Sequence, residues 1–209
     1  MPWSNWIRTV EIEPSLDVVD TASLGSAVDV LLRTGCRIFH MHVEGEADVV
    51  RLLEVTPHLR RYGGVLDVHV RGGDPMLAFV LLPDAGADSI TFDAASVSDP
   101  AIAIRAARSG GVPVGIAFEP SAAPEAVAAA ADGADLVLCE ADGEDIVDRI
   151  HRIADLLPTG VVIQVEGHLV HDHLPRLYQA GARLLVVDSP IFDREDLPRA
   201  YRRLVRALV

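Results

Sequence analysis

Eight short runs rich in Val, Ile and Leu alternate with helix-like segments along the whole 209-residue chain. Each run is nearly continuous in hydrophobicity, which is typical of strands that are buried on both faces. The runs occupy residues 8–13, 37–43, 65–70, 89–93, 113–118, 136–139, 161–166 and 184–188. This alternation predicts parallel strands that are connected by helices.

Helices are predicted between the strands, and glycines that can adopt the left-handed conformation follow several of them. The predicted helices start at residue 20 or 21 and run to 33, and then cover 75–82, 99–108, 124–131, 144–157, 174–180 and 195–208, with glycines at 35, 86, 110, 133 and 181. Eight strand–helix units in about 200 residues indicate an α/β protein with one (β/α)₈ TIM-barrel domain over residues 1–209. A doubly wound open sheet is the alternative, although no Gly-x-Gly-x-x-Gly motif follows the first strand.

The chain contains no lysine, and all 18 of its basic residues are arginine. Schiff-base chemistry needs a side-chain amine that can become nucleophilic, which arginine does not provide. Lysine-dependent aldolase, decarboxylase and pyridoxal-phosphate mechanisms are therefore excluded.

The formal net charge of −13 disfavours a nucleic-acid partner, and from the sequence we expect no basic stripe. No run approaches the ~20 apolar residues of a membrane span, so we expect no membrane partner. Without a recognisable secretory signal, the expected location is cytoplasmic. Cys36 and Cys139 lie beside apolar runs and are predicted to be buried free thiols.

Polar residues stand near the carboxyl ends of several predicted strands, where barrels of this kind carry their active sites. His40 and His42 are two residues apart on one strand, so their side chains share a face. His69 and Glu166 come from two other strands at a matching depth. Three imidazoles and a carboxylate suit zinc, iron, manganese or cobalt, so a divalent metal ion is the expected cofactor.

Short motifs follow one another in a specific order along the chain. They are Pro-Ser-Leu at 14–16, Phe-His-Met-His-Val at 39–43, Leu-Asp-Val-His-Val at 66–70, Gly-Ile-Ala-Phe-Glu-Pro at 115–120, Val-Glu-Gly at 165–167 and Asp-Ser-Pro-Ile-Phe at 188–192. This series resembles the ribulose-phosphate 3-epimerase family, whose motifs are Pro-Ser-Ile-Leu-Ser, Ile-His-x-Asp-Val-Met-Asp-Gly, Asp-Val-His-Leu, Gly-x-x-x-Asn-Pro, Val-Asp-Gly-Gly and Gly-Ser-Ala-Ile-Phe.

The resemblance implies a barrel of the ribulose-phosphate-binding type that acts on a small carbohydrate and forms a homo-oligomer. That family binds a divalent metal through two His and two Asp, at the positions of His40, His42, His69 and Glu166. Its two Asp also move the proton through an enediolate, so the resemblance assigns catalysis to His42 and Glu166. Ser15 matches a residue that lies against the substrate.

The chain departs from the family pattern at two metal-ligand positions, at two phosphate-site positions and in one loop. Histidine stands at position 42 and glutamate at position 166, where the family has aspartate. The remaining substrate-binding candidates are Gly167, His168, Asp188 and Ser189, but His168 and Asp188 replace glycines of the phosphate site. The family's long loop after the sixth strand is replaced by a short acidic segment at 139–145.

An altered phosphate site predicts a substrate other than ribulose 5-phosphate, because a carboxylate repels a phosphate dianion. His171 and His173 could restore positive charge or simply face solvent at the start of a helix, and Asp93 and Glu119 are weaker candidates for binding a hydroxyl group. Three hypotheses stay open: a metal-assisted carbohydrate epimerase or isomerase, a catalytically degenerate barrel that acts as a binding or regulatory subunit, and a metal-dependent lyase or aldolase.

Overall fold

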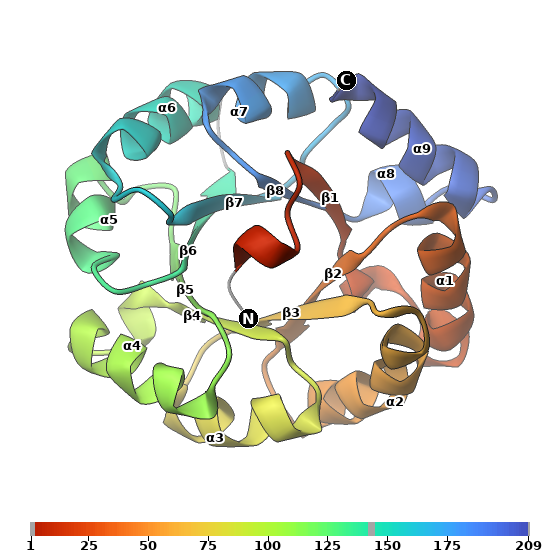
Figure 1. The fold of residues 1–209 in the computed structure, drawn as a ribbon, viewed down its shortest axis with the longest axis horizontal. Coiled ribbons are helices and arrows are strands. Elements are labelled where there is room, and N and C mark those ends of the chain that lie inside the picture. The colour runs from red at the N-terminus through yellow and green to blue at the C-terminus, as the bar shows by residue number, and fades with distance from the viewer. Residues whose placement is uncertain (1–2, 142–144, 209) are drawn as a thin grey trace.

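The computed structural model describes residues 3–141 and 145–208, and their eight strands form one parallel sheet (Figure 1). The strands are β1 Glu11–Pro14, β2 Ile38–Val43, β3 Val65–Val70, β4 Ser89–Asp93, β5 Val114–Phe118, β6 Leu136–Ala141, β7 Val162–Gly167 and β8 Leu184–Val187. They pair in the order β1-β8-β7-β6-β5-β4-β3-β2, and a bridge between Ser15 and His40 brings β1 beside β2. The predicted (β/α)₈ barrel is confirmed, and the open-sheet alternative is wrong.

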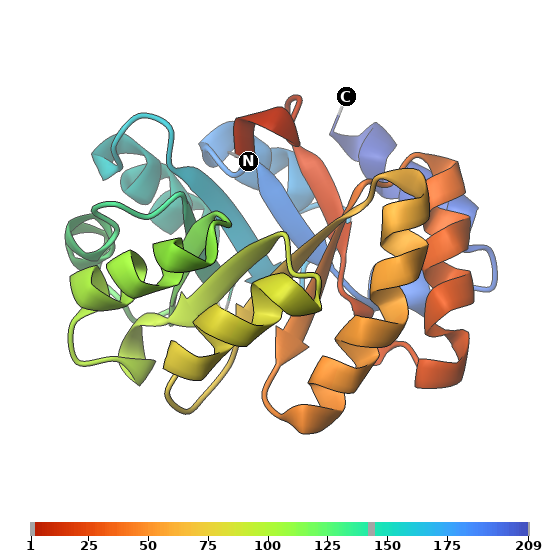
Figure 2. The ribbon, with the colours of Figure 1, turned by 60° about the horizontal axis from the view of Figure 1, so that its bottom comes forward.

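Helices surround the strands on the outside of the barrel, as Figures 1 and 2 show. They are α1 Thr21–Thr34, α2 Glu46–Tyr62, α3 Met76–Ala85, α4 Pro100–Ala107, α5 Pro124–Ala130, α6 Ile146–Leu156, α7 Leu174–Ala180, α8 Ser189–Phe192 and α9 Leu197–Ala207. Short 3-10 turns occur at η1 Trp3–Asn5, η2 Leu16–Val18, η3 Ala94–Ser96 and η4 Arg108–Gly110.

The helix α2 was not predicted from the sequence, although it has 17 residues. Pro57 lies inside it, and a proline in a helix interior removes a hydrogen bond and usually argues against a helix. Here the buried side chains of Leu52, Val55 and Leu59 hold the helix against the barrel. The helices α1, α3 and α7 end at the predicted glycines, whereas α4 and α5 end before Gly110 and Gly133. Residue 144, where the sixth helix was predicted to start, lies outside the described residues.

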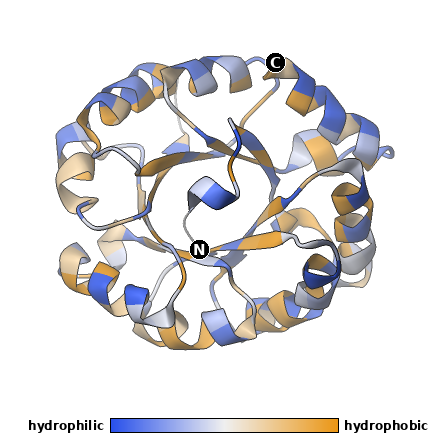
Figure 3. Cartoon of the chain, viewed as in Figure 1, coloured by the Kyte–Doolittle hydropathy of each residue, from blue (hydrophilic) through white to orange (hydrophobic). Residues whose placement is uncertain are grey.

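The main hydrophobic core lies between the strands and the ring of helices, as expected for strands with two buried faces. Figure 3 shows hydrophobic colour on the strands and on parts of the helices. Cys36 and Cys139 are both buried and unpaired, which confirms that prediction. No helix among residues 3–141 and 145–208 is long and apolar enough to cross a membrane.

The barrel interior is layered by polarity. At the end where the strands begin, Trp3 of η1 packs on Ile38, Val65, Leu136 and Leu184, among other apolar residues. Figures 1 and 2 show η1 lying across this end of the barrel. Above this apolar layer the interior becomes polar, with buried charged and polar side chains at Glu13, His40, Asp67, Ser89 and Gln164. The apolar layer therefore closes one end, and the polar side chains face the other.

The outer face of α9 contradicts one expectation from the sequence. From the net charge we expected no basic stripe, but Arg199, Arg202, Arg203 and Arg206 are all exposed on this helix. Their spacing of three, four and seven residues places them on one face. The expectation failed because net charge averages over the chain and carries no information about where the charges gather.

Candidate functional site

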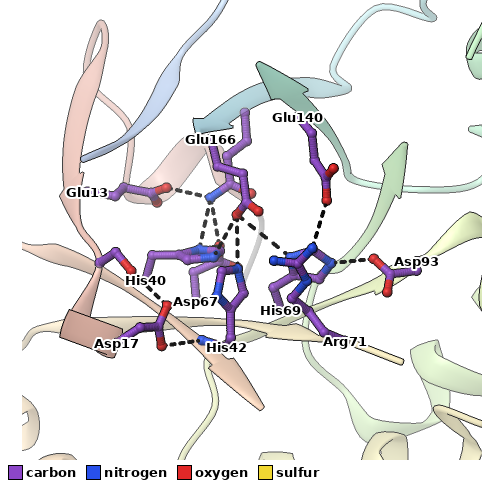
Figure 4. Close-up of polar contacts among 12 residues, drawn as sticks. Glu13, Asp17, His40, His42, Asp67, His69, Arg71, Asp93, Glu140 and Glu166 are labelled. Carbon is purple, nitrogen blue, oxygen red and sulfur yellow. Dashed lines mark hydrogen bonds and ion pairs between the residues drawn. The ribbon is translucent and has the colours of Figure 1, made fainter. Parts of the chain in front are cut away.

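The four predicted ligand residues reach the barrel interior from three strands. His40 and His42 lie on β2, and His42 pairs in register with His69 of β3. Glu166 lies one residue before the end of β7. Side chains two residues apart on a strand share a face, which here is the interior face. Figure 4 shows all four side chains converging.

One carboxylate oxygen of Glu166 is the centre of this cluster. Its Oε2 atom lies 3.2 Å from Nε2 of His40, 3.2 Å from Nε2 of His42 and 3.7 Å from Nδ1 of His69. One possible ligand atom from each of the four residues lies within 4.8 Å of all the others. The structure therefore brings together all four residues that the sequence predicted as a group.

Each imidazole uses its second ring nitrogen to contact a separate aspartate. The Nδ1 atom of His40 lies 2.9 Å from Asp67, and Nδ1 of His42 lies 2.8 Å from Asp17. The Nε2 atom of His69 lies 2.8 Å from Asp93. A carboxylate behind a metal-binding histidine fixes the orientation and tautomer of the ring. These three contacts therefore aim the opposite nitrogen of each ring at Glu166.

Asp17 and Asp67 were not predicted as site residues, and Asp93 was considered only for binding a hydroxyl group. The available signal was alternation, because Asp67 precedes His69 by two residues and so shares its face. Asp17 gave no such signal, since it lies in the 3-10 turn η2 after β1 and meets His42 only in the folded barrel.

The donor set fits a divalent metal ion. His40 Nε2 and His69 Nδ1 are buried, and apart from their approach to Glu166 Oε2 they have no hydrogen-bond partner among the described residues. Bonds of about 2.1 Å in a tetrahedral arrangement separate donor atoms by roughly 3.4 Å, close to the distances around Glu166 Oε2. Two buried nitrogens without a further hydrogen-bond partner would otherwise carry a desolvation cost.

A second polar cluster lies beneath the imidazoles. Asp67 accepts hydrogen bonds from Ser89 and from Nε2 of Gln164, the latter at 2.7 Å. Gln164 also donates to Glu13 of β1. Burial, together with the nearby charge of Asp67, raises the pKa of Glu13 to about 8. A neutral Glu13 avoids a second negative charge beside Asp67 in the barrel interior.

The charges of the site are set by ion pairs that outweigh burial. Burial alone would raise the pKa of Glu166, but His40, His42 and His69 hold it well below its usual range. Burial would lower the pKa of His40, yet Asp67 and Glu166 raise it well above the ordinary value. Asp17 and Glu166 likewise raise the pKa of His42 against the effect of burial. Glu166 is therefore ionised, and a bound cation would replace protons on the imidazoles.

A cavity of about 480 Å³ lies at the ends of β3 to β6 and meets the cluster at Asp93, the partner of His69. Arg71 lines it and pairs with Glu140 at 3.2 Å, as Figure 4 shows. Asp93 and Glu119, the weaker candidates for binding a hydroxyl group, also line this cavity. Three carboxylates against one guanidinium give the cavity an acidic lining.

The predicted substrate-binding residues are spread around the strand ends. Ser15 is buried at the end of β1 and donates its hydroxyl to Asp17 at 2.8 Å. Gly167 ends β7 with a φ of 130°, and a Cβ there would approach the carbonyl oxygen of Ala141 to 2.6 Å. The side chain of Asp188 accepts a hydrogen bond from the amide of Ser189 at the start of α8. This carboxylate therefore occupies the amide that follows the position where the resemblance implies a glycine of the phosphate site.

The other histidines do not join the cluster. His168 is exposed just after β7. His171 lies 3.2 Å from its neighbour Asp172, and His173 precedes the first residue of α7. No contact joins these three histidines to the imidazoles of β2 and β3 within the described part of the chain.

The fold and the cluster together define a (β/α)₈ barrel with a histidine–carboxylate site at the carboxyl ends of its strands. A family model described as the ribulose-phosphate 3 epimerase family matches residues 11–192, and the chain belongs to this family. It is a divergent member, because its sequence identity to the two curated relatives described next is only 22% and 23%.

Two of those relatives are named ribulose-phosphate 3-epimerase. The protein of Aquifex aeolicus (strain VF5) is 22% identical over 209 residues, covering 92% of this chain and 94% of that protein. The protein of Bacillus subtilis (strain 168) is 23% identical over 216 residues, covering 91% of this chain and 96% of that protein.

Solved structures with low identity share the fold. The 3-hexulose-6-phosphate synthase of Salmonella typhimurium matches with a TM-score of 0.77 and 20% identity, over 95% of this chain and 98% of that one. The orotidine 5'-phosphate decarboxylase of Pyrococcus horikoshii OT3 matches with a TM-score of 0.76 and 14% identity, over 94% of this chain and 98% of that one.

Proposed function

We propose that this chain is a metal-assisted epimerase or isomerase that acts on a small carbohydrate. The observation that carries the proposal is the convergence of three aspartate-backed imidazoles on one oxygen of Glu166. Membership of the epimerase family supports the reaction class. The low identity to the named epimerases leaves the substrate to be argued from the site itself.

The metal ligands in this proposal are His40, His69 and Glu166. An aspartate at position 42 has two oxygens and can bind a metal and move a proton at once. The imidazole of His42 has one nitrogen for both tasks, because its Nδ1 atom is engaged by Asp17. Two histidines and one glutamate form a known ligand set for catalytic zinc that leaves a position open. His42 is then available for proton transfer.

His42 and Glu166 are the proposed proton-transferring groups. The Asp17 contact keeps the proton of a neutral His42 on Nδ1, so Nε2 holds the lone pair that can accept a substrate proton. Glu166 can bind a cation through one oxygen and exchange a proton through the other. A bound divalent cation would stabilise the negative charge that develops on the substrate oxygen in an enediolate.

The charges at the strand ends favour a neutral substrate over a phosphorylated one. Asp188 already accepts the Ser189 amide, and its charge would repel a phosphate at that position. The cavity beside Asp93 is lined by three carboxylates, Asp93, Glu119 and Glu140, and its one guanidinium, Arg71, is paired with Glu140. Carboxylates of this kind bind hydroxyl groups well. We therefore propose an unphosphorylated polyhydroxy ketone as the substrate class.

Metal content is the first experiment. Protein purified without added metal, or reconstituted and dialysed, is expected to hold one divalent ion per chain by elemental analysis. His69→Ala should lower metal affinity at least tenfold, because it removes one of the three ligands. His151→Ala is the matched control, since this histidine is exposed on α6. His42→Gln should keep the metal in this proposal, and its loss would instead indicate four protein ligands.

Exchange of a carbon-bound proton is the second experiment. Ketoses with and without a phosphate group are incubated with the protein in heavy water, and deuterium incorporation is followed by NMR. We expect exchange on an unphosphorylated ketose, with loss in Glu166→Gln and His42→Gln. Metal-loaded protein that exchanges no ketose proton would refute the epimerase and favour the degenerate barrel, whose support is the Asp188 carboxylate at the phosphate position.

A further inference from the structure

The groove beside α9 has a charge that the reaction at the barrel centre does not explain. Arg199, Arg202, Arg203 and Arg206 lie on the outer face of this helix, and Arg194 precedes it. The opposite face of α9 is buried through Ala200, Tyr201 and Leu204. Figure 3 shows hydrophilic colour along this helix at the rim of the barrel. Residues 194–206 contain five arginines against Glu195 and Asp196, a net charge of +3, in a chain of −13.

These five guanidinium groups make no ion pair or side-chain hydrogen bond among residues 3–141 and 145–208. Of the other thirteen guanidinium groups, five pair with carboxylates, in Arg33–Asp29, Arg60–Asp88, Arg71–Glu140, Arg108–Asp135 and Arg152–Glu125. Arg8, Arg61, Arg105 and Arg176 also make no such contact among the described residues, but they lie on separate segments of the chain. The chain has 31 acidic residues, so partners for arginine are abundant. Like charges at neighbouring helix positions repel one another. An external anion would relieve this repulsion.

The arginines line two adjoining hollows. One, of about 570 Å³, lies between α8 and α9 and is lined by Arg194, Arg199 and Arg203 with His171 and Ser189. The other, of about 720 Å³, is lined by Arg199, Arg202, Arg203 and Arg206, again with His171. Arg199, Arg203 and His171 belong to both, so the hollows form one groove. Asp196 also lines both, and Asp193 lines the first, which leaves the arginines in excess.

The length and positive charge of this groove fit a short, multiply charged anion. A guanidinium binds phosphate oxygens through two parallel hydrogen bonds. The arginine row from 199 to 206 spans seven residues, or roughly 10 Å of helix, which matches two or three linked phosphates. A long polyanion would extend beyond the groove over the rest of the chain, whose net charge is −16 when the +3 of residues 194–206 is taken from −13. A short one would not.

We propose that the α8–α9 groove binds a small molecule that carries two or more linked phosphate groups. None of the arginines contacts His40, His42, His69 or Glu166 among the described residues, and the groove meets the candidate substrate-binding residues only at Ser189. The proposal does not depend on the reaction at that cluster.

The test is calorimetric titration of the full chain with inorganic triphosphate and with ATP at 0.15 M salt, with inorganic phosphate for comparison. We expect saturable binding of both polyphosphates at one site, and at least tenfold weaker binding of inorganic phosphate. Arg199→Gln/Arg203→Gln removes the two guanidinium groups that both hollows share, and should weaken triphosphate binding at least tenfold.

The matched control is Arg61→Gln/Arg105→Gln, which makes the same change in net charge at exposed positions on α2 and α4. It should bind triphosphate as the unaltered chain does, and circular dichroism establishes that both variants are folded. Equal weakening in the two double variants would overturn the proposal, because it would show an effect of net charge alone. Absence of binding at millimolar triphosphate, or tighter binding of a single-stranded oligonucleotide than of triphosphate, would overturn it as well.

Discussion

The contact between Asp17 and His42 shows two residue changes that compensate each other. The family motifs place leucine and aspartate at these two positions, and both differ here. Asp17 lies 2.8 Å from His42 Nδ1 and also accepts the His42 backbone amide at 2.9 Å. A leucine at position 17 would leave that ring nitrogen without its carboxylate. The two substitutions, at positions 17 and 42, therefore place an oriented imidazole where the family has a carboxylate.

Asp17→Asn is expected to slow ketose proton exchange by about 10- to 100-fold while leaving the metal in place. The amide lacks the negative charge that fixes the tautomer of His42, so the lone pair is no longer held on Nε2. Deuterium incorporation and elemental analysis measure the two quantities. Asp20→Asn is the matched control on the exposed residue before α1. Equal rates in the two variants would contradict a positioning role for Asp17.

Glu13 should make stability depend on pH in metal-free protein. Its pKa is raised to about 8 in the fold, so the fold binds this proton more tightly than the unfolded chain does. Its contribution is full below pH 4.5 and is lost as pH rises through 8. The difference is on the order of 5 kcal/mol for a fully buried group.

The measurement for Glu13 is urea unfolding between pH 5 and 9 after treatment with a chelator. In Glu13→Gln the free energy of unfolding should fall less steeply with rising pH than in the unaltered chain. Glu54→Gln, at an exposed position of α2, should follow the unaltered chain. Parallel pH profiles for the unaltered chain and Glu13→Gln would show that Glu13 titrates normally.

At the scale of elements, the strands were predictable and their helical connections less so. The eight apolar runs correspond to the eight strands within a few residues, because strands with two buried faces carry their own signature. The helix α2, which has Pro57 in its interior, was not predicted. The four metal-ligand candidates could be found because residue alternation decides which side chains face the interior. Their aspartate partners were harder to find, because pairs such as His69 and Asp93 meet through the register of neighbouring strands.

Asp188→Asn at the start of α8 tests the charge argument against phosphorylated substrates. Removing this negative charge should lower the KM for a phosphorylated ketose by at least tenfold relative to its unphosphorylated counterpart, since repulsion of a nearby dianion is lost. The amide can still accept the Ser189 backbone hydrogen bond, so stability should change by less than about 1 kcal/mol. Steady-state kinetics of both substrates provide the ratio. Asp155→Asn, with the same charge change at an exposed position of α6, should leave the ratio unaltered.

At the scale of the whole molecule, the turn η1 contributes to the barrel although it precedes the first strand. Trp3 is 2% exposed and packs on the apolar layer that includes Ile38, Val65 and Leu184. Trp3→Ala should lower the free energy of unfolding by about 3 kcal/mol, because it leaves a cavity that the rigid strands cannot fill. Urea unfolding measures this loss. Trp6→Ala should cost clearly less, since Trp6 is only half-buried.

The oligomeric state is also a property of the whole molecule, and the homo-oligomer implied by the family resemblance stays a prediction. Light scattering on the purified full chain measures its mass directly. A mass above the 22.4 kDa of one chain would support it, and a mass of one chain at micromolar concentration would contradict it.

The apolar layer beneath the imidazoles affects the order in which a metal ion and a substrate can bind and dissociate. Since Trp3 and its neighbours close the end where the strands begin, the described residues leave the histidine cluster to be approached from the opposite end. A metal ion and a sugar would both reach the site from that end. The metal ion would therefore bind before the sugar, and the sugar would dissociate before the metal ion. A chelator should consequently strip the ion slowly whenever the sugar is in place.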